Sequence, residues 1–193
     1  MEYIKELQTC KIGKVKMKDD SLTVEYTEEY TTANYINKIT NSCAQLVHND
    51  LKRAFNLLKP HVVKICEMPE SEQVAIEYPL EDEYNDEELN NYVVTGYVRG
   101  GTGEYEGVTI IAQKLLKCGK TLNLVVPFIK FSPENNDYPY SDELKCVIDM
   151  CDYEVDAYLF DNKWGVRQQD LFGFDGEANI TEVEFEDECA IKS

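Results

Sequence analysis

The chain has 193 residues, of which 43% are hydrophobic and 11% aromatic, so it can bury a core without disulfides or a metal. No run approaches the roughly 18 apolar residues of a membrane span, and residues 1–6 lack the basic and apolar regions of a signal peptide. The seven cysteines form no CxxC pair, and the two histidines add no zinc-site spacing. We therefore expect a cytoplasmic protein with reduced thiols and without a metal or cofactor.

The net charge of −18 is unevenly distributed along the chain. Residues 67–91 carry ten acidic groups and no basic one, and residues 134–193 carry 17 acidic groups against four basic ones. The other two segments, 1–66 and 92–133, have small positive net charges. The whole-chain charge opposes contact with nucleic acid, but this division leaves room for a basic face on the strand-rich segments.

The first third of the chain predicts three strands and a helix. Residues 11–17 and 21–26 form a hairpin pattern, with its turn at Lys18-Asp19-Asp20, and residues 35–44 also fit a strand. Asn49 caps a helix that Pro60 should end or kink, because proline lacks an N–H and clashes with the preceding turn. Residues 61–66 fit either a continued helix or a strand.

An acidic connection and a second set of strands follow. Residues 67–91, which include Pro69 and Pro79, predict an exposed connection. Strands are expected at residues 92–99, 108–114 and 121–128, joined by turns at residues 100–103 and at Cys118-Gly119. Ser141 caps a second helix, whose apolar side chains fall on one stripe: Leu144, Val147, Ile148, Cys151, Val155, Tyr158 and Leu159.

The predicted fold class is therefore α+β, a mostly antiparallel sheet with two helices in the order βββα, acidic linker, βββα, tail. We expect one domain over residues 1–162, with two similar halves at residues 1–66 and 92–162 as a further organisation, and an acidic C-terminal segment over residues 163–193. An oligonucleotide-binding barrel and a sliding-clamp domain share parts of this order. Such analogies of fold do not decide function.

No arrangement of residues predicts catalysis. Gly119-Lys120-Thr121 resembles the end of a phosphate-binding loop, but Lys114 stands where that pattern needs a glycine. The carboxylates near the C-terminus lack the spacing of a calcium loop. We predict that the protein is not an enzyme.

Aromatic and basic residues of the second half are the candidates for contact with nucleic acid. Exposed rings on a sheet can stack on single-stranded bases, and nearby cations can bind the phosphates. The candidate residues are Tyr97, Arg99, Tyr105, Lys114, Lys117 and Lys120. The alternative is that tyrosines in strands fill half-buried positions of the sheet.

The pentapeptide at residues 168–172, Gln-Gln-Asp-Leu-Phe, resembles the sliding-clamp-binding motif of bacterial replication proteins. The resemblance implies that Gln168 binds at a pocket rim, that Asp170 helps to set a turn, and that Leu171 and Phe172 anchor in an apolar pocket. Gln169 departs from the leucine that is frequent at the second position. The alternative is a last strand over residues 166–174 that packs on the domain.

A strand-rich body followed by an acidic segment with embedded phenylalanines resembles phage and bacterial single-stranded-DNA-binding proteins, and the chain also resembles small phage or prophage proteins. In that family the tail recruits partner proteins, although this chain ends in Ile191-Lys192-Ser193 and not in an acidic tip with phenylalanine.

The resemblance implies a non-enzymatic accessory protein of DNA metabolism. Its body would contact single-stranded DNA weakly, and its tail would recruit a sliding clamp or another replication or recombination protein. The alternative is an acidic protein-binding module, or a nucleic-acid mimic, that inhibits a host protein. The oligomeric state stays open.

Overall fold

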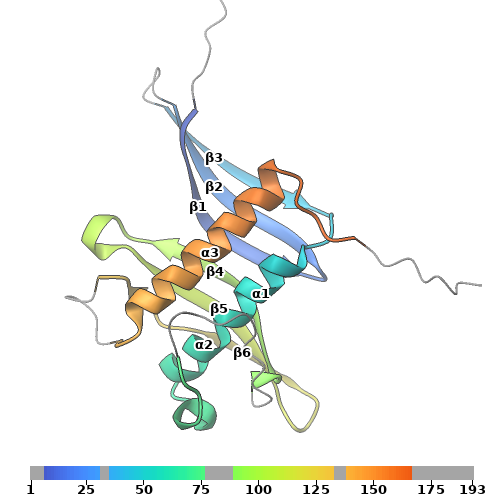
Figure 1. The fold of residues 1–193 in the computed structure, drawn as a ribbon, viewed down its shortest axis with the longest axis vertical. Coiled ribbons are helices and arrows are strands. Elements are labelled where there is room, and N and C mark those ends of the chain that lie inside the picture. Colours follow the sequence, from blue (N-terminus) through green and yellow to red (C-terminus); the bar gives the residue numbers. More distant parts are fainter. Residues whose placement is uncertain (1–6, 31–34, 77–88, 133–137, 167–193) are drawn as a thin grey trace, which may run out of the picture.

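The computed structural model describes residues 7–30, 35–76, 89–132 and 138–166, and these residues build one antiparallel sheet with helices on one side (Figure 1). The sheet order is β3-β2-β1-β4-β5-β6, and the short β7 pairs with β5. The predicted α+β class is confirmed. The strands are β1 (Leu7–Lys18), β2 (Ser21–Tyr30), β3 (Tyr35–Cys43), β4 (Tyr92–Gly100), β5 (Gly107–Leu115), β6 (Thr121–Val125) and β7 (Ile129–Lys130).

The helices are α1 (Asn49–Leu57), α2 (Lys59–Ile65) and α3 (Ser141–Phe160), with short 3-10 turns at η1 (Pro69–Glu72) and η3 (Gly103–Tyr105). Pro60 lies in the first turn of α2, so the predicted first helix is broken there and continues over residues 61–65. The N-cap of α1 is His48, whose Nδ1 accepts a hydrogen bond from the Asp50 N–H at 3.2 Å, and the N-cap of α3 is Tyr140. Both predicted caps were therefore one residue too late.

The first hairpin turns where the sequence predicts it. Asp19 and Asp20 adopt φ values of 51° and 58°, the left-handed conformation that a two-residue turn between twisted strands requires. Aspartate reaches this region more readily than most residues, because its short side chain can hydrogen-bond locally. The turn sets the register of β1 and β2, in which Val15 lies opposite Val24 and Lys14 opposite Glu25.

Two three-stranded meanders meet at the centre of the sheet. Each meander is followed along the chain by helices. The two meanders join where Lys14–Lys16 of β1 pair with Gly96–Val98 of β4. We call this contact the seam. The register of β4 against β5 shifts between Val94 and Gly96, which marks a β-bulge. A Cβ atom at Gly96 would overlap the carbonyl oxygen of Val15, so the two strands approach closely only because this residue is glycine.

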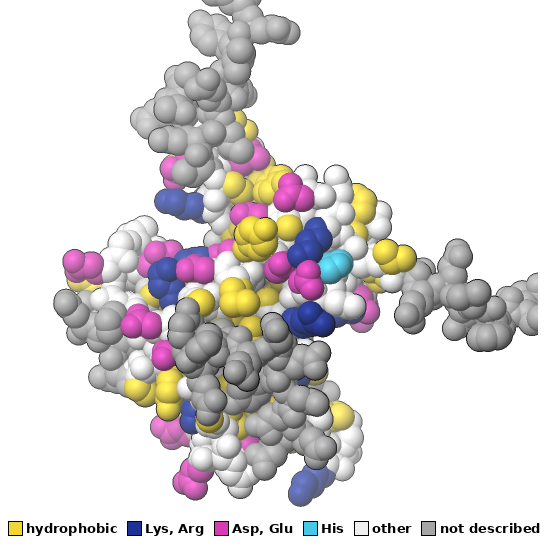
Figure 2. All heavy atoms as spheres, viewed as in Figure 1, with side chains coloured by type: hydrophobic (Ala, Val, Ile, Leu, Met, Phe, Trp, Pro, Cys, Tyr) yellow, Lys and Arg dark blue, Asp and Glu magenta, His cyan; other side chains and the backbone are white. Residues whose placement is uncertain are grey.

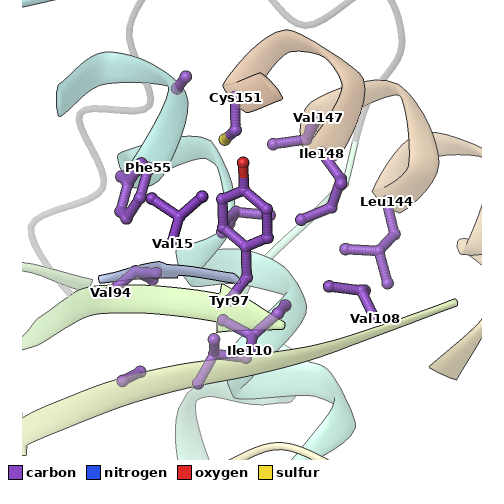
Figure 3. Close-up of a cluster of buried hydrophobic side chains, with 14 of the residues drawn as sticks. Val15, Phe55, Val94, Tyr97, Val108, Ile110, Leu144, Val147, Ile148 and Cys151 are labelled. Atoms are coloured by element: carbon purple, nitrogen blue, oxygen red, sulfur yellow. The ribbon is translucent and has the colours of Figure 1, made fainter. Parts of the chain in front are cut away.

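The core lies between the sheet and the helices. Of the predicted stripe on α3, six side chains are buried and Leu159 is partly buried against the same cluster. Tyr97 projects from β4 into this layer, towards Cys151 and between Phe55 and Ile148 (Figure 3). α1 packs against both α3 and β4, so the two halves share one core.

The sequence predicted an exposed connection over residues 67–91, but both of its described ends contain a buried residue. Val74 and Leu89 are buried, and Glu70 accepts hydrogen bonds from the Lys114 ammonium at 2.7 Å and from the Tyr92 hydroxyl at 2.9 Å. The apolar residues at its two ends thus pack on the body, since burying them removes apolar surface from water. Residues 77–88 lie outside the described residues.

The folded part also continues past the predicted boundary at residue 162. Trp164 bridges to Val47, its indole N–H donates to the Tyr158 carbonyl at 3.0 Å, and the Gly165 N–H donates to the Leu46 carbonyl at 2.7 Å. Among the described helices, none is both long and apolar enough to cross a membrane.

We predict that Gly96→Ala lowers the free energy of unfolding by about 2 kcal/mol or more, because the added methyl group forces β1 and β4 apart. Urea denaturation of the purified protein measures this loss. Gly13→Ala in β1 is the matched control, because its Cβ would meet the Glu25 carbonyl oxygen at 3.4 Å, an ordinary contact. Equal midpoints for the two variants would contradict this account of the seam.

Candidate functional site

Tyr97, a predicted base-stacking residue, is fully buried, so it cannot stack on a nucleic-acid base. Its hydroxyl donates to Asp152 of α3 at 2.5 Å, and burial followed by the Asp152 charge raises its pKa well above the usual range. The cause is the bulge in β4. Strict alternation from the buried Tyr92 would turn Tyr97 away from the helices, and the extra residue reverses this.

Arg99 is likewise directed towards α3 and is not available to phosphate groups. Its guanidinium forms ion pairs with Glu106 at 2.9 Å, with Asp149 at 3.3 Å and with Asp152, and only 17% of its side chain is exposed. Burial alone would lower the pKa of Arg99, but the three carboxylates outweigh that cost and raise it. Three anions around one cation leave no positive charge for a polyanion to bind.

Lys114 is engaged as well. Its ammonium contacts the Glu70 carboxylate at 2.7 Å and lies 4.8 Å from the centre of the Tyr92 ring. The side chain is only 15% exposed. Its partner comes from the acidic connection, so the lysine holds that segment against the sheet.

The other three predicted contacts are accessible, but they lie apart. Tyr105 is 61% exposed in the loop between β4 and β5, with the Lys130 ammonium 5.1 Å from its ring centre. Lys117 and Lys120 are exposed in the turn between β5 and β6. These loops sit at opposite ends of β5, about 30 Å apart for a nine-residue strand. The structure does not bring the six predicted residues together, and the pentapeptide at residues 168–172 lies outside the described residues.

The helix layer carries many charges, and several of them neutralise one another in ion pairs. Figure 2, which views the molecule from the helix side as in Figure 1, shows basic and acidic side chains intermingled over this face. Lys163, for example, contacts Asp50 and Glu154 at 2.7 Å each, and Lys145 contacts Asp149 at 2.6 Å. The described residues of α3 also expose apolar side chains, among them Met150, Tyr153 and Phe160, on the same helix as these charges.

The opposite face of the sheet, which we call the open face, is covered by no described helix. On β4, β5 and β6 it presents aliphatic side chains where a solvated face normally has polar ones. Val93 is 51% exposed and Val125 is 68% exposed, and Ile111 lies between β4 and β6 opposite Val125. The ring of Phe128, 45% exposed, lies over the paired Gly100 and Gly107.

On β1, β2 and β3 the same face is mostly polar and carries lysines, although Ile36 of β3 is an exposed apolar side chain on it. One row of cross-strand neighbours shows the change across the seam: Ser42, Thr23, Lys16, Gly96, Ile111 and Val125. The next row runs from Thr40 through Glu25 and Lys14 to Val98 and Thr109. The open face thus has a lysine-bearing half and an aliphatic half, which meet at β1 and β4.

A cavity of about 300 Å³ opens at one end of the seam. It is bounded by residues 10–13 of β1, by Arg99, Gly100 and Gly101, and by Asp152 and Asp156 of α3. Burial, reinforced by the Asp152 charge, raises the pKa of Asp156, and burial beside Asp156 raises the pKa of the Cys10 thiol to about 11. The neutral thiol is a poor nucleophile at physiological pH, so the cavity shows no activated cysteine.

His61 is the second polar group of note. It is 1% exposed in α2, its Nδ1 is 2.8 Å from the Tyr138 hydroxyl, and its Nε2 is buried without a partner among the described residues. Burial lowers the pKa of His61 to about 3, so the ring is neutral at physiological pH. It connects the start of α3 to α2 as a packing residue.

Comparisons with protein-family models, with curated proteins and with solved structures give no match to this chain. Within the described residues, no group of three or more histidines, cysteines or carboxylates could hold a metal ion. The open face of the sheet is the candidate functional site of the chain.

We predict that stability falls by about 1.4 kcal/mol per pH unit as pH decreases from about 6.5 towards 3, on account of His61. In this window the unfolded chain binds a proton on the imidazole that the folded chain excludes. Urea unfolding at a series of pH values measures the slope.

The His61→Leu variant should lack this part of the slope, since leucine fills a similar volume and does not titrate. The difference between the two proteins isolates His61 from the carboxylates, which both proteins share. His48→Asn, at the other histidine, keeps a capping side chain and should retain the slope of the natural protein. Identical slopes for His61→Leu and the natural protein would contradict the assignment.

Proposed function

We propose that the chain is a non-enzymatic protein-binding module that docks a partner on its open face. The observation behind this proposal is the group of aliphatic side chains on the open face of β4, β5 and β6, where Ile111 pairs with Val125 and Val93 lies on the same side of the sheet. Single exposed apolar residues are ordinary on proteins, but several of them on one uncovered sheet face are typical of an interaction surface.

The surroundings of the patch suit a protein interface. Thr109, Gln113 and Asn123 lie on the same face among the aliphatic residues, and the Gln113 amide donates to Asn123 at 3.1 Å. Interfaces combine an apolar centre with polar groups that hydrogen-bond at the edge. Strand-borne side chains are also held rigidly, which reduces the entropy lost on binding.

Mimicry of nucleic acid has less support than docking. A mimic needs an array of unneutralised carboxylates, whereas Asp50, Asp149, Asp152 and Glu154 of the helix layer are all paired with lysine or arginine. The acidic surplus lies in residues 67–91 and 134–193, where it favours solubility. The six described cysteines are free, which supports a place in the reducing cytoplasm.

Single-stranded DNA is the second candidate for the same face, because five lysines of β1 and β3 are displayed there: Lys11, Lys14, Lys16, Lys18 and Lys38. This supports a role as a DNA-metabolism accessory protein with a basic contact on the body. The aromatic stacking that such a contact normally uses is confined on the described open face to Phe128. Recruitment of a sliding clamp by residues 168–172 stays a prediction.

The first test of the module is photocrosslinking from the open face. A benzophenone amino acid at position 125 should yield a specific crosslinked protein in source cells, while the same group at Tyr153, 71% exposed on α3, should not. The identified partner, once purified, should bind at least about tenfold more weakly to Val93→Asp, because a buried carboxylate must be desolvated.

Two controls accompany this test. Val93→Thr keeps the shape of the side chain and should weaken binding less, and Tyr153→Asp should leave the affinity unchanged. Urea midpoints confirm that each variant is folded. Equal crosslinking from positions 125 and 153, or equal affinities of the partner for Val93→Asp and the natural protein, would rule out the open face as the docking surface.

A further inference from the structure

The charge of this protein is divided between the two faces of the sheet. Although the chain carries −18 overall, five lysines and two glutamates occupy the open-face positions of β1, β2 and β3. The open-face positions of β4, β5 and β6 hold no charged residue. The charged residues are Lys11, Lys14, Lys16, Lys18 and Lys38, with Glu25 and Glu29.

The glutamates occupy only part of this positive charge. Lys14 contacts Glu25 at 2.7 Å, while Lys11 is 3.9 Å from Glu29 with 70% of its side chain exposed. Lys16 and Lys38 are exposed and form no ion pair within the described ranges 7–30, 35–76, 89–132 and 138–166. Exposed ammonium groups of this kind remain free to pair with an incoming carboxylate.

Lys16 also stands at the border between the two halves of the face. Gly96 lies next to it across the seam and adds no side chain, and Ile111 and Val125 follow in the same row. A ligand that lies along this row meets a cation first and aliphatic side chains next, over four strands spaced about 5 Å apart. From Lys16 to Val125 the row therefore changes from positively charged to apolar.

We infer that the open face takes an acidic polypeptide whose carboxylates lie over the lysines of β1 and β3 and whose apolar side chains lie over β4, β5 and β6. This inference rests on the proposed docking function and names the chemistry of its partner. Charge complementarity selects an acidic partner and steers its approach, and the aliphatic half supplies the burial that holds it.

Two other occupants fit the same surface less well. A nucleic acid would leave Val93, Ile111 and Val125 without apolar partners, and its phosphates would meet Glu25 and Glu29. A second copy stacked face to face either opposes lysines to lysines or covers the lysines of each copy with the aliphatic half of the other, which has no carboxylate to pair with them. Like charges placed opposite each other across an interface oppose association.

Fluorescence anisotropy with three labelled probes tests the inference on the full chain. The probes are a synthetic peptide with a glutamate-rich half and a valine- and phenylalanine-rich half, its twin with lysine for every glutamate, and a short oligothymidylate. The acidic peptide should bind, and its affinity should fall at least about tenfold in Lys16→Glu at low salt. The lysine twin should show no binding.

Lys117→Glu makes the same charge change in the β5–β6 turn, away from the row, and should alter the affinity by less than about twofold. Amide chemical-shift changes on addition of the acidic peptide should map to both halves of the open face. Tighter binding of oligothymidylate than of the acidic peptide, equal binding of the lysine twin, or equal effects of Lys16→Glu and Lys117→Glu would overturn the inference.

Two variants distinguish a failure of the acidic-partner inference from a failure of the docking function. If the crosslinked partner requires Val93 but binds Lys16→Glu as tightly as the natural protein, the open face docks a protein and the acidic chemistry is wrong. If the partner does not require Val93, the docking function itself fails.

Discussion

The close approach of β1 and β4 at Gly96 is the contact on which the rest of the structure depends. Only Lys14–Lys16 and Gly96–Val98 pair there, yet this short ladder joins two meanders into one sheet. The bulge before Gly96 also decides which side chains enter the core. It turns Tyr97 and Arg99 towards α3, where both bind Asp152. The seam therefore couples the two strand sets and the last helix through one carboxylate.

The same constraint creates the division of the open face. Because the helices α1, α2 and α3 all lie on one side, the second side of a six-strand path is left without a described cover. The boundary between lysines and aliphatic side chains falls on the seam, where Lys16 neighbours Gly96. The lysines come from the first half of the chain and the aliphatic side chains from the second half. The docking surface can therefore form only when both halves belong to one sheet.

Much of the local structure could be predicted because its causes are local. The turn at Asp19-Asp20, the break at Pro60 and the apolar stripe of α3 each follow from residues close in sequence. The pairing of Val15 with Tyr97 joins residues about 80 positions apart, and no pattern in either segment indicates that these two strands pair. The isolated glycine at position 96 was the one signal of a bulge, and a bulge reverses the face of every later residue.

The candidate site was missed for the same reason, although a signal existed. Val93-Val94 and Ile110-Ile111 are apolar pairs within strands, and Val125-Val126 is an apolar pair at the end of β6, so each places one apolar side chain on either face. Three of the residues predicted to contact nucleic acid already have partners within the fold. Tyr97 and Arg99, which the bulge turns towards α3, contact carboxylates, and Lys114 contacts Glu70 of the acidic connection.

The cavity at the end of the seam gives the sheet two inner edges in addition to its outer ones. Where β1 and β4 part, backbone groups of residues 10–13 and of residues 99–101 border empty space instead of each other. Exposed strand edges invite pairing with other chains, and proteins suppress this with charged side chains directed inward. Arg99 and Asp152, which form an ion pair, line the cavity together with Asp156. These charged side chains oppose the pairing of another chain at the point where β1 and β4 separate.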